Sequence, residues 1–283
     1  MAAVHPGVYH LLVDCYPHDW SVVARGLAVG GPLAAVALYK LAKEDVQRLR
    51  HDAVNLACGM VGIVLIAVFA GPRINAFNAS IDSRGIGMLH WLKIGGWRNV
   101  AASIVILDFL GWWWHYAEHK IEPLWRLHQV HHSDPELNFS TTYRSHWAET
   151  AAEIAGRMAQ YALVGPSLVA IAVYELIIIL LSQYQHTDVG MPEAWESRLS
   201  AVFITTRMHY VHHSMSPYDY GSNYGFIFSW WDALLGTYRT FEQARMAGAV
   251  TTGVGEYPDA AKLTFRELLW MPFRREQPGG RAF

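Results

Sequence analysis

Apolar stretches of membrane-spanning character divide the first part of the chain. Residues 26–39 and 53–72 carry no charge, and the mainly apolar residues 99–114 end in three consecutive tryptophans. A helix needs about 20 apolar residues to cross a hydrocarbon core of roughly 30 Å, which residues 53–72 supply alone and residues 26–39 only with their flanks. The pattern therefore predicts three membrane-spanning helices before residue 115.

The apolar stretch from residue 147 to residue 185 is too long for a single span. Gly165 and Pro166 interrupt it at the middle, leaving two halves that are each about 27 Å long as helices. This pattern predicts an antiparallel helical hairpin with its tip at Gly165 and Pro166. One tilted span over residues 158–182 is the alternative. The hairpin is favoured because it returns His186 to the side of the membrane that carries His146.

Charged side chains inside the hairpin indicate which faces are packed. Glu149, Glu153 and Arg157 are spaced by four residues and share one helix face. Glu175 lies inside the second half, where an unpaired charge in lipid is costly, and Arg157 is a candidate partner. These faces are therefore expected to point into the bundle or toward a functional site.

The rest of the pattern completes the predicted fold class. From residue 191 onward no apolar run is long enough to cross a membrane. Basic residues between the first two stretches predict a cytoplasmic loop, although residues 73–98 on the other side are also basic in part. The sequence predicts an all-α, multi-pass membrane helical bundle of three spans plus a helical hairpin, with a helical cytoplasmic cap.

Composition supports a membrane protein. The chain is 52% hydrophobic and 16% charged, whereas soluble domains have about a quarter of their residues charged. A formal net charge of −2 and the lack of a Lys/Arg tract argue against nucleic-acid binding.

Histidine is the strongest chemical signal. The sequence has 15 histidines, and ten of them lie between His115 and His213. Residues 115–119 read H-x-x-x-H, and residues 128–132 and 209–213 both read H-x-x-H-H. Residues three and four apart on a helix point to the same side, so each cluster presents its imidazoles together. The candidate metal ligands are His115, His119, His128, His131, His132, His186, His209, His212 and His213, with His146 as a further candidate.

The number of imidazoles is sufficient for two metal ions. Imidazole suits zinc, copper, iron and nickel, so the spacing alone does not choose the metal. A closed structural zinc site often contains cysteine, and the clusters contain none. The protease motif H-E-x-x-H is absent, because Tyr116 and Gln129 follow the first histidines of their clusters. An open, nitrogen-rich pair of ions at the membrane surface favours oxygen chemistry over the activation of water.

At these motifs the sequence resembles the fatty acid hydroxylase superfamily, also called the sterol desaturase family. It is most similar to the bacterial members and the alkylglycerol monooxygenase branch. The resemblance runs from Asp108 to Tyr238 and rests on residues 108–119, 124–133, 138–146, 186–188, 209–214, 223–225 and 231–238. Two positions depart from the family pattern: Tyr116 stands where Arg is usual, and Trp147 where Pro is usual.

The resemblance implies an iron-dependent lipid hydroxylase or desaturase. It implies two non-haem iron ions held by the histidines at the cytosolic face, with dioxygen as co-substrate. A separate electron donor is implied, either a ferredoxin or a cytochrome with its reductase. The substrate would be a lipid such as a fatty acyl, alkylglycerol or sterol-like molecule, in a bacterial inner membrane or the endoplasmic reticulum.

Residue roles and domain boundaries follow from the same resemblance. Asp108 is expected to orient a ligand imidazole, or alternatively to bond a neighbouring helix. Asn223 is expected to brace the last histidine cluster. The expected division is residues 1–98 for the N-terminal spans and loops, 99–240 for the di-iron domain, and 241–283 for a cytoplasmic tail.

Two other functions compete with this reading. A non-redox metalloprotein, either a hydrolase or a metal transporter, would use the same ligands. A transporter should place polar residues in broken helices at mid-membrane, whereas these histidines cluster at span ends and in the cap. A non-catalytic scaffold should lack some of the cluster histidines, and none is missing.

Overall fold

The computed structural model describes residues 46–187, 191–216, 219–254 and 263–274. The chain from Arg50 onward forms one compact unit. Its described elements are helices, and these residues include two isolated bridges but no strand. The all-helical fold class is therefore confirmed for the described part. The expected span at residues 26–39 lies outside the described residues.

Two of the described helices are long and apolar enough to cross a membrane. Residues 48–69 of α3 (Val46–Phe69) form one of them, close to the expected span at residues 53–72. The other is α9 (Leu168–Gln185), the second half of the expected hairpin. After α3 the chain continues as α4 (Gly71–Arg84), which has a proline in its first turn. The short α5 (Met88–Trp91) follows.

The longest described helix is α6 (Gly96–Lys120), which extends beyond the expected span at residues 99–114 at both ends. It is not one of the two helices apolar enough to qualify as a span. Its last two turns carry His115 and His119, both buried. The number of spans and the side of the cap remain predictions.

The predicted helical hairpin is present. The helix α8 (Trp147–Val164) ends at Gly165, whose φ of 74° lies in the left-handed region that glycine adopts without strain. Ser167 then caps α9 by accepting a hydrogen bond from the Ala170 N–H at 3.2 Å. The expected ion pair is also present, with Arg157 Nε 3.6 Å from Glu175 Oε1.

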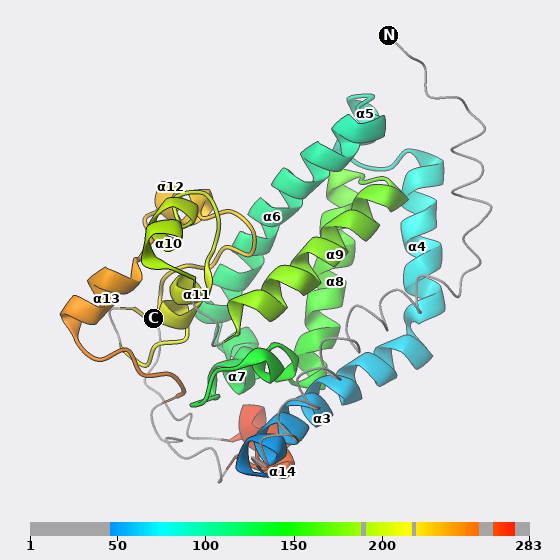
Figure 1. The fold of residues 1–283 in the computed structure, drawn as a ribbon. Coiled ribbons are helices and arrows are strands. Elements are labelled where there is room, and N and C mark those ends of the chain that lie inside the picture. Colours follow the sequence, from blue (N-terminus) through cyan, green and yellow to red (C-terminus); the bar gives the residue numbers. More distant parts are fainter. Residues whose placement is uncertain (1–45, 188–190, 217–218, 255–262, 275–283) are drawn as a thin grey trace. The chain divides into compact units, whose positions relative to one another are not determined.

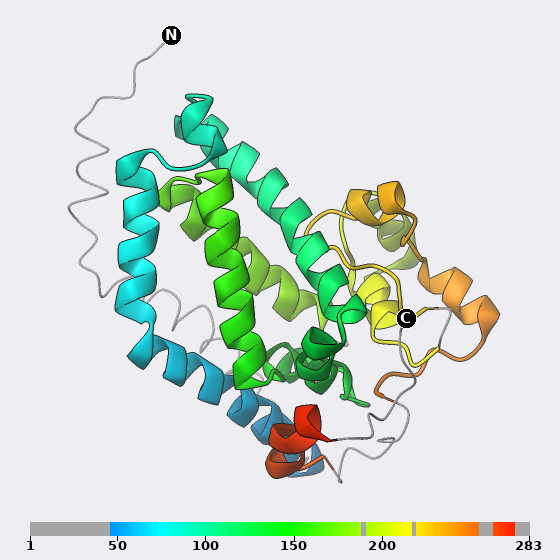
Figure 2. The same cartoon turned by 180° about the vertical axis from the view of Figure 1, so that it is seen from behind.

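The hydrophobic core joins the hairpin to α6. Buried residues of α4, α6, α8 and α9, including Ile81, Leu107 and Tyr174, form one cluster. Tyr174 on α9 donates its hydroxyl hydrogen to the Leu107 carbonyl of α6 at 3.1 Å. In Figures 1 and 2, α6 lies between the hairpin and the group of short helices α10 to α13.

Short helices fill the rest of the described chain. They are α7 (Glu122–His132), η1 (Phe139–Tyr143), α10 (Glu193–Leu199), α11 (Thr206–His212), α12 (Trp230–Leu235), α13 (Phe241–Ala247), α14 (Phe265–Trp270) and η3 (Met271–Phe273). Hydrogen bonds tie the segment before α12 to α6, and α11 packs against α9. Apart from His146 at the start of α8, the candidate ligands outside α6 lie on α7, on α11 with its C-terminal residue, and at the end of α9.

Candidate metal centre

Four helix ends bring the predicted ligands together. The chain leaves α6 after His119 and turns at Ile121, and Pro123 lies in the first turn of α7. The last turn of α7 carries the second histidine cluster, and α11 with its C-terminal residue carries the third. His186 ends α9. Each cluster therefore lies on a helix, as its spacing predicts.

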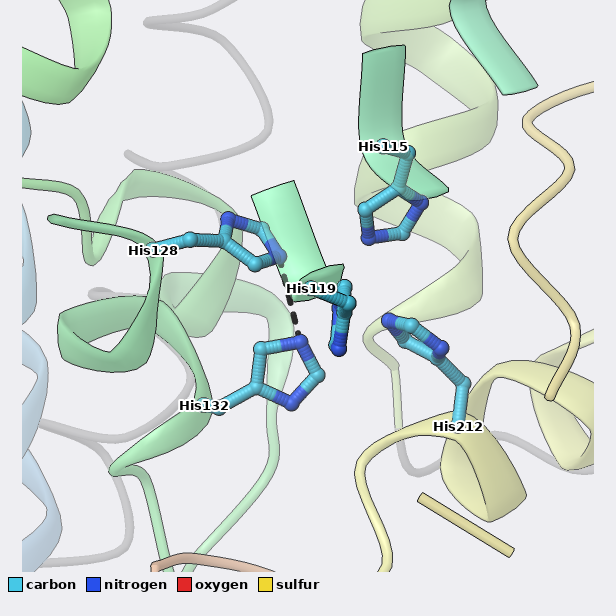
Figure 3. A group of neighbouring side chains, drawn as sticks. All are labelled: His115, His119, His128, His132 and His212. Atoms are coloured by element: carbon cyan, nitrogen blue, oxygen red, sulfur yellow. Dashed lines mark hydrogen bonds between the residues drawn. The ribbon is translucent and has the colours of Figure 1, made fainter. Parts of the chain in front are cut away.

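Nine of the ten predicted ligands converge into two groups. In each group, every residue offers one nitrogen, and these nitrogens lie within 4.8 Å of one another. The first group, shown in Figure 3, is His115, His119, His128, His132 and His212. The second group is His131, His186, His209 and His213. All but the partly buried His131 are buried.

The two groups are neighbours because α7 and α11 each contribute to both. His128 and His132 of α7 join the first group, while His131 between them joins the second. The rings of His132 and His213, one from each group, stack with their centroids 4.3 Å apart. The arrangement is a pair of adjacent nitrogen-lined sites.

Hydrogen bonds orient four of the imidazoles. His115 Nδ1 lies 2.9 Å from the Tyr224 carbonyl, and His212 Nδ1 lies 2.7 Å from the Ser222 carbonyl. His186 Nδ1 lies 2.7 Å from the Ser182 carbonyl, and His128 Nδ1 lies 2.6 Å from Glu149 Oε1. An oxygen acceptor at Nδ1 requires that Nδ1 carries the hydrogen. The opposite Nε2 atoms therefore keep their lone pairs for a metal.

The inward-facing nitrogens fit a bound cation. His186 Nε2 lies 3.1 Å from His131 Nε2 and 3.0 Å from His209 Nε2. Within the described chain, both His119 nitrogens and His212 Nε2 are buried without a hydrogen-bond partner. A buried polar atom that lacks a partner costs about 1–3 kcal/mol, a cost that a metal ion would remove. The donor set is all nitrogen, which suits iron, zinc, copper or nickel.

Burial keeps these rings neutral. It lowers the pKa of His128 to about 3 and that of His186 to about 4. Burial also lowers the pKa of His132 and His213 well below the ordinary value, with their histidine neighbours adding to the effect. A neutral imidazole is the form that binds metal.

His146 is not brought into either group. Its Nδ1 accepts a hydrogen bond from the Ala148 N–H at 3.2 Å, so it caps the start of α8. Its ring contacts Trp147 and Phe273 instead of the other histidines. His146 is therefore a helix-capping residue in this structure.

Asp108 has a different role from the expected contact with a ligand imidazole. Its carboxylate accepts hydrogen bonds from the Ile227 and Phe228 N–H groups, at 2.9 and 3.1 Å, and from the Trp231 indole at 2.9 Å. It thus ties the segment before α12 to the middle of α6. These contacts agree with the alternative expectation that Asp108 bonds a neighbouring helix, because three N–H groups distant in sequence, one of them from α12, occupy the carboxylate.

Asn223 contacts the helix that carries the last histidine cluster, as expected of a bracing residue. Its side-chain amide donates to the Met208 carbonyl of α11 at 3.0 Å and to the Arg239 carbonyl at 2.8 Å. Its backbone φ is 55°, a left-handed conformation that asparagine tolerates better than most residues.

Sequence reasoning missed the carboxylates that support the rings. Glu149 contacts His128 directly, and Glu118 Oε2 lies 3.9 Å from His128 Nδ1. Asp232 accepts hydrogen bonds from the Tyr224 and Gly225 N–H groups, next to the carbonyl that receives His115. The sequence did predict that the helix face of Glu149 points into the bundle or toward a functional site. It did not predict that Glu149 contacts His128.

A buried polar network fixes the end of α7. Arg144, 1% exposed, donates to the Val130 carbonyl, to Ser133 and to Asn55. Asn55 in turn donates to Asp134 at 3.0 Å. This network holds the backbone immediately after the second histidine cluster.

Comparison with known proteins finds one family model and several relatives named as hydroxylases or monooxygenases. Residues 100–237 match the family model described as fatty acid hydroxylase. The alkylglycerol monooxygenase of Danio rerio is 27% identical over 259 residues, covering 81% of this chain and 56% of that protein. The ornithine lipid hydroxylase OlsE of Rhizobium tropici is 32% identical over 141 residues, covering 50% and 41%. The human cholesterol 25-hydroxylase is 27% identical over 145 residues, covering 50% and 52%.

The chain spans about half the length of these curated relatives. No solved structure matches it.

Proposed function

Because the chain belongs to the fatty acid hydroxylase family through residues 100–237, we propose that it is a membrane lipid hydroxylase that binds two iron ions. The observation that carries the proposal is the pair of adjacent groups of buried imidazoles. Each group would hold one ion. Iron bound there would supply the activation of dioxygen, using two electrons from an external donor.

The chain's own residues prepare the site for this chemistry. Burial excludes water from eight of the nine rings and keeps them neutral. The Tyr224 and Ser222 carbonyls and the Glu149 carboxylate hold three rings of the first group with Nε2 facing inward. Such outer contacts fix ring orientation and raise the basicity of a ligand.

The substrate we propose is a lipid whose tail reaches the site from the bilayer. The names of the relatives refer to an alkylglycerol, an ornithine lipid and cholesterol, which share an amphipathic lipid character. We propose a separate electron donor, either a ferredoxin or a cytochrome with its reductase, on the cytoplasmic side. Desaturation of the same class of lipid is the nearest variant of this function.

Lipid profiling of cells that express the chain tests the proposal. Wild type is compared with His131→Ala, which removes a ring of the second group, and with His90→Ala. His90 lies outside both groups, which makes the second variant a matched control. Under isotopically labelled dioxygen, a lipid carrying one labelled oxygen is expected in wild type and His90→Ala and not in His131→Ala.

Other results would identify a different function. A lipid that loses two hydrogens without gaining oxygen would indicate desaturation. A product whose oxygen comes from water, or identical lipids in all three strains, would contradict an oxygen-dependent hydroxylase and favour the non-redox metalloprotein.

A further inference from the structure

Two short helices of the C-terminal part bury a carboxylate and expose large apolar side chains, although α10 also exposes Glu193, Ser197 and Arg198. In α12, Asp232 is fully buried, while Leu234 is 74% exposed and Trp230 is 43% exposed. In α10, Glu196 is buried and Trp195 is 58% exposed. A surface helix of a water-soluble protein has the opposite arrangement. The exposed side chains Trp195, Phe203, Trp230, Leu234 and Leu235 are called the outer patch below.

Both inward carboxylates accept hydrogen bonds, although Glu196 Oε2 has no hydrogen-bond partner within the described chain. The Asp232 carboxylate accepts hydrogen bonds from the Trp112 indole, the Thr237 hydroxyl and two backbone N–H groups. Glu196 accepts a hydrogen bond from the Thr205 hydroxyl. These bonds hold α12 with its apolar side outward and α10 with Trp195 outward.

The outer patch lies beside the middle of α6. The Trp231 indole donates to Asp108, and the Phe109 and Trp231 rings have centroids 4.9 Å apart. Trp230 stacks on Phe228 at 4.3 Å. Figures 1 and 2 both place α12 next to the central turns of α6.

The neighbouring face of α6 is an apolar stripe. The stripe consists of every fourth residue: Trp97, Ala101, Val105, Phe109 and Trp113. All five are apolar. Four of them are exposed, and Phe109 is half-buried beside Trp231. The stripe is about 24 Å long at 1.5 Å per residue, close to the thickness of a hydrocarbon core. Phe109 lies about 6 Å along the helix from Trp113, the tryptophan at one end of the stripe.

We propose that the outer patch is a lipid-contacting surface, inserted at the boundary between acyl chains and headgroups of the bilayer. Amphipathic helices at this boundary insert by about 5–10 Å. With Trp113 at the interface, Phe109 and the Trp231 ring beside it lie about 6 Å deeper, which is within this range. Tryptophan favours the interface. The Arg198 guanidinium lies 6.0 Å from the Trp195 ring centre, from where it can reach lipid phosphates. The inference rests on membrane attachment of the chain but not on its metal or its reaction.

A lipid surface fits better than a second copy of the chain. The patch continues an apolar stripe of bilayer length on α6 instead of forming an isolated spot. In addition, α9 exposes an apolar face of its own, with Val169, Leu176 and Leu180 about half exposed. One continuous solvent, the bilayer, accounts for all of these faces.

The patch is linked to the first group of histidines. Asp232, on the inner side of α12, accepts the Tyr224 N–H at 2.8 Å, and the Tyr224 carbonyl lies 2.9 Å from His115 Nδ1. The helix that we place against lipid therefore also positions a candidate metal ligand. This link would hold the metal centre at the level where lipid tails begin.

Spin labels on the full-length protein test the proposal. The background is Cys15→Ser with Cys58→Ala, reconstituted in phosphatidylcholine–phosphatidylglycerol nanodiscs. Labels are attached at Leu234→Cys on α12 and, as a second position, at Trp195→Cys on α10. The matched control is Arg245→Cys on α13, whose side chain is 65% exposed. Electron paramagnetic resonance then compares collisions of each label with oxygen and with a water-soluble nickel chelate.

The expected result is that oxygen dominates at residues 234 and 195 and the chelate dominates at residue 245. Calibration with lipid spin labels should give a depth of about 5–10 Å at residue 234. If the chelate reaches residue 234 as freely as residue 245, the patch faces water and the proposal is wrong. Exclusion of both reagents from residue 234 would also overturn it, because it would indicate a contact between proteins.

Discussion

At the scale of single residues, Glu149 connects the hairpin to the candidate metal centre. Its two carboxylate oxygens contact the His128 ring at 2.6 Å and the His146 N–H at 3.1 Å. The residue is buried, so these contacts are not shared with water. Glu149 thus orients one ligand ring and closes the first turn of α8.

Glu149→Gln should weaken iron binding while the fold remains intact. Glutamine keeps the size but has one acceptor oxygen in place of the two that contact His128 and the His146 N–H. Loss of such an outer partner typically costs 10–100-fold in metal affinity, so a loss of about that size is expected. A chelator competition measures it. Glu122→Gln, in a surface pair with Arg126, is the control and should leave iron retention unchanged. Equal retention in both variants would show that the second oxygen of Glu149 has no such role.

Arg144→Met should destabilise the folded chain strongly. Arg144 donates to the Val130 carbonyl, to Ser133 and to Asn55, and each buried acceptor that loses its donor costs about 1–3 kcal/mol. Asp134 and Asn55 would lose that partner's support. Thermal unfolding in detergent measures the change. Arg126→Met breaks only a partly exposed pair and should cost about 1 kcal/mol or less. A similar small loss for Arg144→Met would refute the network's importance.

The candidate ligands were predictable at this scale, and their supporting residues were not. Helical spacing alone grouped the three clusters, because imidazoles three or four residues apart share a side. The backbone partners of Asp108 lie more than 100 residues away in the sequence. The backbone partners of Asp232 are brought to it by the tight loop before α12. Pairing of that kind is decided by the fold, so local sequence carries no signal of it.

At the scale of elements, the turn between α8 and α9 decides the geometry of the hairpin. Gly165 has a positive φ, and an added Cβ would lie 2.5 Å from the Ile86 carbonyl oxygen. The neighbouring Ser167 N–H donates to Asn99 of α6 at 2.8 Å. The tip of the hairpin is therefore packed against other segments.

Gly165→Ala should lower the melting temperature more than Gly236→Ala does. Both glycines have positive φ, so both substitutions carry the left-handed strain of about 1–2 kcal/mol. Only residue 165 adds a backbone clash, since nothing lies within 4 Å of an added Cβ at residue 236. Equal shifts in the two variants would mean that the hairpin tip relaxes freely.

The hairpin was predictable because Gly165 and Pro166 are local signals, whereas the C-terminal helices were not. The helices α10 and α12 have seven and six residues, and each buries a carboxylate while exposing a large apolar side chain. Their positions depend on Asp108, Glu196 and Asp232. A hydrophobic pattern read from sequence assumes polar residues outside, and here that assumption fails.

At the scale of the whole molecule, nine neutral imidazoles, eight of them buried, make the metal-free protein sensitive to acid. The pKa values of His128, about 3, and His186, about 4, lie below the ordinary value of 6.5. Between about pH 6.5 and pH 4, the unfolded chain binds protons at these residues that the folded chain does not. Stability of the metal-free protein should therefore fall as the pH falls through this range.

Melting of chelator-treated protein between pH 7 and pH 5 measures this effect. The melting temperature should decrease steadily with acidification. A melting temperature that stays constant or rises would mean that the rings are not held neutral by burial.

Counting the metals tests the central claim most directly. Elemental analysis and Mössbauer spectroscopy of the purified full-length chain should find two iron ions per chain, with nitrogen-rich coordination. His209→Ala, in the second group, should reduce the content toward one ion while the first group keeps its own. A single ion per chain, or zinc in place of iron, would contradict a two-iron centre.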